Sequence, residues 1–173
     1  MKPRTHGIYW LLVTGCWLLV LFGCTYDTVS LLPVYIKKIC ITGFENKSFR
    51  PDLPEKILQS VTREFIIDGR LTVTGEKEAD AVLYGEISRY DLQPLSYTDQ
   101  MKVQEYKVRM VLSFWLKDVK ENKILWRENN LENFTTVSSS TGGLEVKLEN
   151  DAIDEVVQKL SKRVVKRIID GWT

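Results

Sequence analysis

Cys24 is the residue whose surroundings most clearly indicate chemistry, because its thiol follows directly on an apolar segment. Residues 8–22 are apolar except for Thr14 and Gly15, the basic residues Lys2 and Arg4 precede them, and the small Gly23 stands just before the cysteine. A positive start, a short apolar run and a small residue are typical of a secretory signal. The run is shorter than the roughly 20 residues that span a bilayer.

Residues 21–24, Leu-Phe-Gly-Cys, resemble the lipobox of bacterial lipoproteins. The resemblance implies that a diacylglycerol is attached to the Cys24 thiol and that cleavage removes residues 1–23. Thr25 follows, and an aspartate at that position retains such lipoproteins in the inner membrane of enteric bacteria. By this analogy the chain is lipid-anchored in the outer membrane and faces the periplasm. The alternative is an uncleaved N-terminal membrane anchor.

The sequence offers no catalytic machinery after the signal. The only histidine, His6, lies within residues 1–23, which excludes imidazole-based nucleophilic catalysis and histidine metal sites in the processed chain. Cys40 lies between Ile39 and Ile41, which predicts a buried, inert thiol rather than a reactive one. The 150 residues from 24 to 173 carry 22 basic and 23 acidic side chains, a balance that gives no reason to expect nucleic-acid binding. We therefore predict a non-enzymatic protein with no cofactor and no metal.

The first half of the domain follows a tether, residues 24–34. Residues 35–42 predict a strand that is apolar on both faces, and residues 43–48 a loop. A helix is predicted over residues 53–68, with Asp52 as its cap, Glu55 reaching back to it, and Gly69 as its end. A short strand, 71–74, should then pair in parallel with the first.

The second half predicts three longer strands and a long helix. Residues 79–92 form a strand that Pro94 ends. In residues 103–116 an apolar series at every second position from Tyr106 to Leu116 alternates with mostly polar side chains, and residues 124–137 return with a bulge at 128–130. Residues 145–170 form an amphipathic helix with acids in its first half and bases in its second. The prediction is one α+β domain, residues 35–173: a two-layer sandwich with a mixed sheet of four to five strands and two helices on one face.

Three aromatic residues are candidates for a partner interface. The alternation places Tyr84, Tyr90 and Trp115 on the sheet face that no helix covers, and aromatic residues are enriched at interfaces. The face of Trp126, beside the predicted bulge, stays undecided. The basic run at residues 162–167 has two interpretations: a site for phosphorylated lipid headgroups, or a solvated helix end that complements the helix dipole.

Several stretches resemble the LptE family of outer-membrane lipopolysaccharide-assembly lipoproteins. They are Phe44-Glu45-Asn46, residues 64–71 (EFIIDGRL), residues 79–87 (ADAVLYGEI), Glu105-Tyr106-Lys107-Val108 and Ile124-Leu125-Trp126. With the lipobox and the final helix, they cover nearly the whole processed chain in the family's order.

The resemblance implies a small sheet with two helices and no enzymatic role. It implies that the domain is a plug or partner of the LptD-like β-barrel that places lipopolysaccharide in the outer leaflet, with lipopolysaccharide as a possible second ligand and membrane contact through the N-terminal lipid. The alternatives are an interaction lipoprotein of another envelope complex and, less favoured because of the missing histidine, a lipid-anchored periplasmic enzyme.

Overall fold

The segment with period-two alternation forms the middle one of the three long strands of the sheet. A computed structural model describes residues 32–139 and 146–171, so Cys24 and the signal lie outside the described residues. β4 (Val103–Asp118) pairs antiparallel with β3 (Ala81–Tyr97) and with β5 (Ile124–Ser138). β1 (Lys38–Asn46) pairs in parallel with β3, and β2 (Thr72–Val73) with β1. The result is a mixed five-stranded sheet in the order β2-β1-β3-β4-β5.

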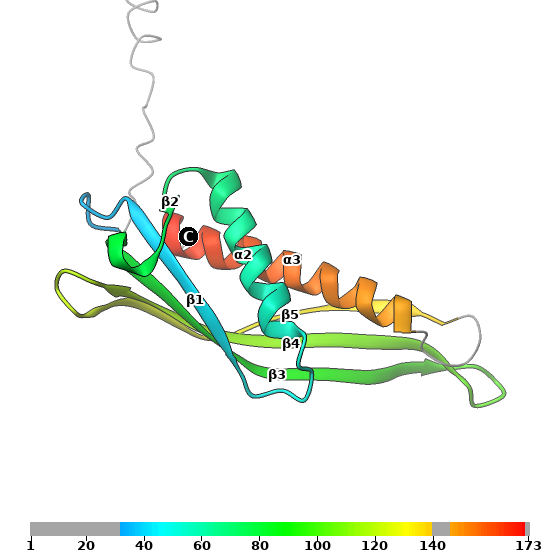
Figure 1. Ribbon diagram of the computed structural model, residues 1–173. Helices are drawn as coiled ribbons and strands as arrows, with labels where there is room; N and C mark the ends of the chain where they lie inside the picture. Colours follow the sequence, from blue (N-terminus) through cyan, green and yellow to red (C-terminus); the bar gives the residue numbers. More distant parts are fainter. Residues whose placement is uncertain (1–31, 140–145, 172–173) are drawn as a thin grey trace, which may run out of the picture.

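Two helices, α2 (Leu53–Asp68) and α3 (Val146–Asp170), lie on one face of this sheet (Figure 1). A short 3-10 helix, η1 (Glu76–Glu78), precedes β3. Side chains of both helices and the facing strand positions form one apolar core, whose fully buried members include Phe65, Phe114, Leu112, Ile153 and Leu160. The predicted α+β architecture is confirmed. Neither helix is long and apolar enough to cross a bilayer.

The bounds of α2 agree with the prediction, but its start is built differently. Gly69 closes the helix in the left-handed conformation, with φ of 72°, and donates its N–H to the Phe65 carbonyl. The Asp52 side chain makes no capping hydrogen bond; its carboxylate instead faces Arg50 Nε at 3.4 Å. Glu55 accepts a hydrogen bond from Gln59, one turn along the helix. The capping box was therefore a wrong prediction, because Arg50, two residues before Asp52, and Gln59, four residues after Glu55, take the two carboxylates.

β1 begins and ends later than the sequence pattern suggested. The predicted strand 35–42 and loop 43–48 are corrected to a strand that runs through Asn46, with a register shift between Ile41 and Phe44. The shift places the Phe44 ring on the sheet face that the helices cover, where it is 5% exposed and packs over Gly85 of β3. A bulge inside a strand is indistinguishable from a loop when only residue periodicity is available.

Gly85→Ala should therefore destabilise the fold, although alanine ordinarily suits a strand better than glycine. A Cβ at residue 85 would lie 2.1 Å from Phe44 Cε1, so the ring would have to move. We expect a loss of about 1–3 kcal/mol in the free energy of unfolding, measured by urea denaturation. Gly43→Ala is the control, because nothing lies within 4 Å of its added Cβ. Equal midpoints for both variants would contradict the Phe44–Gly85 packing.

The irregularities of the long strands are also informative. Pro94 does not end β3, which continues to Tyr97 through register shifts at residues 94–97. The predicted bulge in β5 is confirmed: Leu112 pairs with Leu131 but Phe114 pairs with Glu128, and Asn130 takes a positive φ of 59°. Trp126 is now placed on the covered side, with its ring 4.9 Å from that of Phe114.

Leu112→Ala should be costly because Leu112 is fully buried between sheet and helices. We expect a loss of about 2–5 kcal/mol in the free energy of unfolding. Ser113 is a poor control, since its hydroxyl oxygen accepts from the Asn130 N–H at 3.3 Å and meets the Ser88 hydroxyl at 3.2 Å. Gln104→Ala, exposed on the same strand, should change stability by less than about 0.5 kcal/mol. Comparable losses for Leu112→Ala and Gln104→Ala would show that the register is wrong.

Candidate partner-binding face of the sheet

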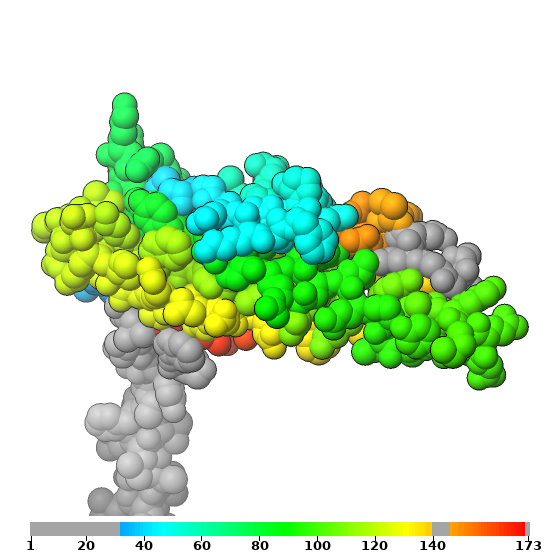
Figure 2. Space-filling model, turned by 90° about the horizontal axis from the view of Figure 1, so that it is seen from below, coloured from blue at the N-terminus to red at the C-terminus, as the bar shows by residue number. Residues whose placement is uncertain are grey.

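The sheet face opposite the helices carries a ladder of stacked side chains across three strands. Tyr84 and Trp115 are cross-strand partners, and their rings stack with centroids 5.8 Å apart and an interplanar angle of 10°. Arg127 pairs with Trp115 from β5 and holds its guanidinium carbon 5.1 Å from the Trp115 ring, within cation–π range. Figure 2 views this side from below; β3 (green), β4 (yellow-green) and β5 (yellow) form much of its surface.

The structure thus brings together two of the three predicted interface residues. Tyr84 and Trp115 are half-buried on the open face, as the alternation indicated. Arg127 was missed by the sequence reasoning. Its place opposite Trp115 could have been found by pairing residues 103–116 with 124–137 as a hairpin, since directly opposite residues share a face.

The predicted position of Tyr90 is wrong. It was expected on the open face, but it is 3% exposed and belongs to the covered core. The cause is a register shift in β3 between Ile87 and Arg89, which inserts Ser88 and exchanges the two faces beyond it. Tyr90 is therefore not an interface residue of the open face.

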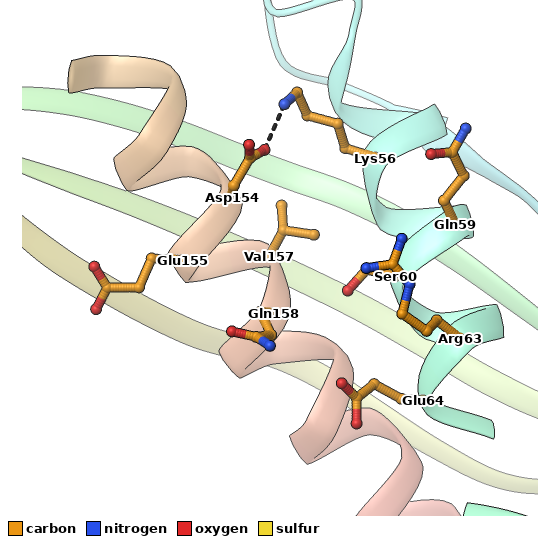
Figure 3. Close-up of a pocket in the computed structure, with 9 residues that line it drawn as sticks. All are labelled: Lys56, Gln59, Ser60, Arg63, Glu64, Asp154, Glu155, Val157 and Gln158. Atoms are coloured by element: carbon orange, nitrogen blue, oxygen red, sulfur yellow. Dashed lines mark hydrogen bonds and ion pairs between the residues drawn. The ribbon is translucent and has the colours of Figure 1, made fainter. Parts of the chain in front are cut away.

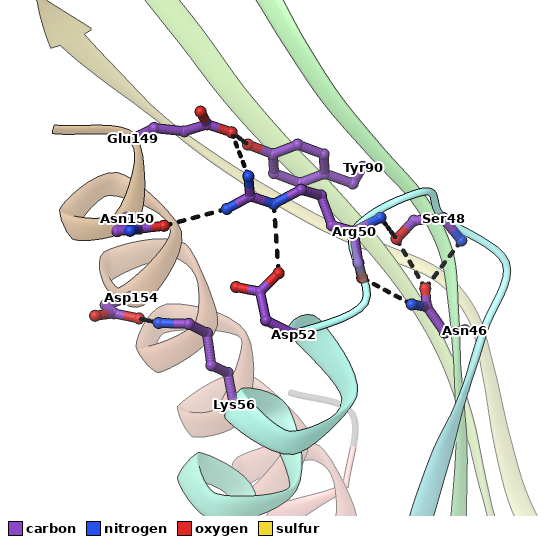
Figure 4. A network of polar contacts seen from close by, with 9 residues as sticks. All are labelled: Asn46, Ser48, Arg50, Asp52, Lys56, Tyr90, Glu149, Asn150 and Asp154. Atoms are coloured by element: carbon purple, nitrogen blue, oxygen red, sulfur yellow. Dashed lines mark hydrogen bonds and ion pairs between the residues drawn. The ribbon is translucent and has the colours of Figure 1, made fainter. Parts of the chain in front are cut away.

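Tyr90 instead belongs to a polar cluster centred on Arg50 (Figure 4). Its hydroxyl donates to Glu149 Oε1 at 2.7 Å, and burial together with this carboxylate raises the pKa of Tyr90. Arg50 Nη1 lies 3.3 Å from the same carboxylate, and Arg50 Nη2 donates to Asn150 Oδ1 at 3.1 Å. The cluster joins the loop before α2 to β3 and to the first turns of α3, so its role is to hold the helix layer on the sheet.

A small apolar group lies beside the ladder on the open face. Cys40, Ala79 and Val82 are buried there, and Tyr84 packs against them. Cys40 is a free cysteine, and burial raises the pKa of its thiol. A raised pKa disfavours the nucleophilic thiolate, which agrees with the predicted inert thiol.

Charges surround the ladder, and most carboxylates are already paired. Arg109 Nη2 lies 2.6 Å from Asp91 Oδ2, and the Lys47 ammonium lies 2.6 Å from Glu86, where their hydrogen bond holds the pKa of the Glu86 carboxyl below its usual range. Lys107 lies 4.1 Å from the centre of the Phe134 ring, which is 49% exposed. The open face therefore offers aromatic and basic groups to a partner, while its acids are largely neutralised within the domain.

A hollow on the other side of the molecule lies between α2 and α3 (Figure 3). Its volume is about 470 Å³, and its lining is polar, with a Lys56–Asp154 ion pair joining the two helices. The other polar lining residues present carboxylates, amides, a guanidinium and the Ser60 hydroxyl. Within residues 32–139 and 146–171, no group of three potential ligands could hold a metal ion.

Solved structures share this fold at low sequence identity. A minor lipoprotein from Acinetobacter baumannii is 16% identical, with a TM-score of 0.54 over 79% of this chain and 92% of its own. A DUF330 protein from Xanthomonas campestris is 12% identical, with a TM-score of 0.53 over 81% and 90%. A lipoprotein from Caulobacter crescentus is 10% identical, with a TM-score of 0.52 over 75% and 86%. At these identities the likeness is one of fold.

A sequence search among curated proteins finds no match. A family model described as lipopolysaccharide-assembly, LptE, matches residues 36–168, from just before β1 to the last turn of α3. The match spans both helices, all five strands and the Tyr84–Trp115–Arg127 ladder. This chain therefore belongs to the LptE lipopolysaccharide-assembly family.

Proposed function

We propose that this chain is a non-enzymatic outer-membrane lipoprotein, anchored through Cys24 and facing the periplasm. In this proposal the domain is a plug or partner of the LptD-like β-barrel that inserts lipopolysaccharide into the outer membrane. Membership of the LptE family supports a role in lipopolysaccharide assembly, since the match covers residues 36–168. The structures of similar fold support the anchor, because two of them are described as lipoproteins.

The single observation that carries the partner role is the Tyr84–Trp115–Arg127 ladder on the open face. Binding energy at protein interfaces is concentrated in a few residues, and tyrosine, tryptophan and arginine are enriched among them. The stacked geometry holds the three side chains in place before a partner arrives, so little conformational entropy is lost on binding. A sheet covered by helices on one side only leaves this face available to a barrel wall.

Purification of the native tagged protein from detergent-solubilised outer membranes tests the proposal. We expect an outer-membrane β-barrel to co-purify, identified by mass spectrometry, and an untagged strain to yield none. Recovery of a different envelope complex would support the alternative, an interaction lipoprotein that belongs to that complex. Recovery of the lipoprotein alone, in a detergent that preserves barrel complexes, would contradict the proposal.

A further inference from the structure

The chain leaves the domain at a fixed place. The Tyr35 hydroxyl donates to the Asp118 carboxylate, and this bond raises the pKa of Tyr35 to about 12. Lys120 lies 5.3 Å from the centre of the Tyr35 ring. The Asp80 carboxylate accepts the N–H groups of Lys37 and Lys38 at 2.9 and 2.8 Å. The segment before β1 is thus held against the end of β4. We call this end of the molecule the anchor end.

The anchor end also exposes large aliphatic side chains. Val34, Ile66 and Ile67 are 92%, 66% and 70% exposed. The two isoleucines occupy the last turn of α2, and Figure 1 shows that the end of α2, the start of β1 and the end of α3 lie at the same end of the molecule. The two isoleucines follow each other in the chain and together expose apolar surface at the end of α2.

The basic run of α3 divides into two pairs with different surroundings. Arg163 donates to the Glu132 carbonyl at 2.7 Å, and Arg167 pairs with Glu128 at 2.5 Å, so both arginines serve the packing of α3 on β5. Lys162 and Lys166 are exposed and form no ion pair within the described part of the chain. Lys37 and Lys77, near the start of β1 and in η1, are likewise exposed and unpaired among those residues.

We infer that the anchor end is itself a membrane-contact surface, which rests on the anionic phospholipid headgroups of the leaflet that holds the lipid. The inference rests on the proposed lipid attachment at Cys24. Cys24 and Leu32 are joined by eight residue-to-residue steps, which span at most about 28 Å when fully extended. The bilayer therefore lies within that reach of the anchor end. Exposed isoleucines enter the headgroup layer, and the free lysines face lipid phosphates, the pattern of an interfacial protein surface.

Nitroxide accessibility on the full-length, lipidated protein in vesicles tests this inference. In a Cys40→Ala background, which removes the free thiol of the domain, a label is attached at Ile67→Cys or, as the control, at Met101→Cys. Met101 is 79% exposed at the β3–β4 turn, at the opposite end of the domain (Figure 1). The vesicles contain phosphatidylcholine with one quarter phosphatidylglycerol. Flotation of the protein with the vesicles shows separately whether the lipid anchor is attached.

We expect the label at residue 67 to be more accessible to lipid-soluble oxygen than to an aqueous nickel chelate, and the label at 101 to show the reverse. Replacing Lys77, Lys162 and Lys166 together with glutamine should lower the equilibrium constant for membrane contact by about fivefold for each lysine. If the protein floats but both labels are equally accessible to the nickel chelate, the inference fails and the proposed lipid attachment is retained. If both labels contact lipid, membrane contact is not confined to the anchor end, and the inference fails. If the protein does not float, the lipid attachment fails, and this inference with it.

Discussion

Cys24→Ala should abolish lipid attachment and release the protein from the membrane fraction. Residues 21–24 present a single thiol at the proposed cleavage site, and Cys40, the other cysteine after the signal, is buried in the folded domain. Alanine cannot form the thioether, and no helix in the described ranges could replace the anchor by crossing a bilayer.

Metabolic labelling with a radioactive fatty acid, followed by fractionation of the envelope, measures this effect. Cys40→Ala is the matched control, because it removes the other thiol and should leave incorporation unchanged. Fatty-acid label in Cys24→Ala at the wild-type level would show that the anchor lies elsewhere. Unprocessed, unlabelled wild-type protein in the membrane would instead favour the uncleaved N-terminal anchor.

Trp115→Asp should nearly eliminate co-purification of the barrel while leaving the free domain folded. Trp115 is the middle member of the ladder, so its loss removes both the Tyr84 stack and the Arg127 contact. The new carboxylate would be desolvated against a partner, and a buried unpaired charge costs more than truncation. A loss of 2 kcal/mol or more is typical of such central residues and corresponds to about a thirtyfold fall in affinity.

The measurement combines circular dichroism of the purified variant with the yield of barrel protein on the tagged lipoprotein. Trp115 is half-buried on the open face and lies outside the helix-covered core, so the spectrum should stay unchanged. Gln158→Asp, an exposed change on the helix layer, should retain the wild-type yield. A folded Trp115→Asp protein with undiminished yield would exclude this face as the interface.

Residue periodicity predicted those parts of the fold where one face of an element is dry throughout. The helix over 53–68 and the alternation from Tyr106 to Leu116 were right because burial imposes a fixed period on each. The predictions failed where one extra residue enters a strand. The shifts near Thr42 and at Ser88 moved Phe44 and Tyr90 to the covered face, and nothing in the residue types on either side signals the change.

The candidate site shows the same limit. The sequence placed Tyr84 and Trp115 on the correct face, but their stacking depends on the register between β3 and β4, and the Arg127 contact on that between β4 and β5. Register is set by contacts across the whole sheet, including the β5 bulge at Asn129 and Asn130, and not by either strand alone. The family resemblance predicted the LptE family, which periodicity alone could not, and the match over residues 36–168 confirms the family.

Site-specific photo-crosslinking in living cells tests the central claim, that the open sheet face meets the barrel, most directly. A photoreactive phenylalanine derivative at position 115 keeps an aromatic ring in the ladder, whereas the same group at Gln59 samples the outer surface of α2 (Figure 3). We expect ultraviolet light to join the lipoprotein to an outer-membrane β-barrel from position 115 and not from position 59. A barrel adduct from position 59 with none from position 115 would contradict the account and place the interface on the helices.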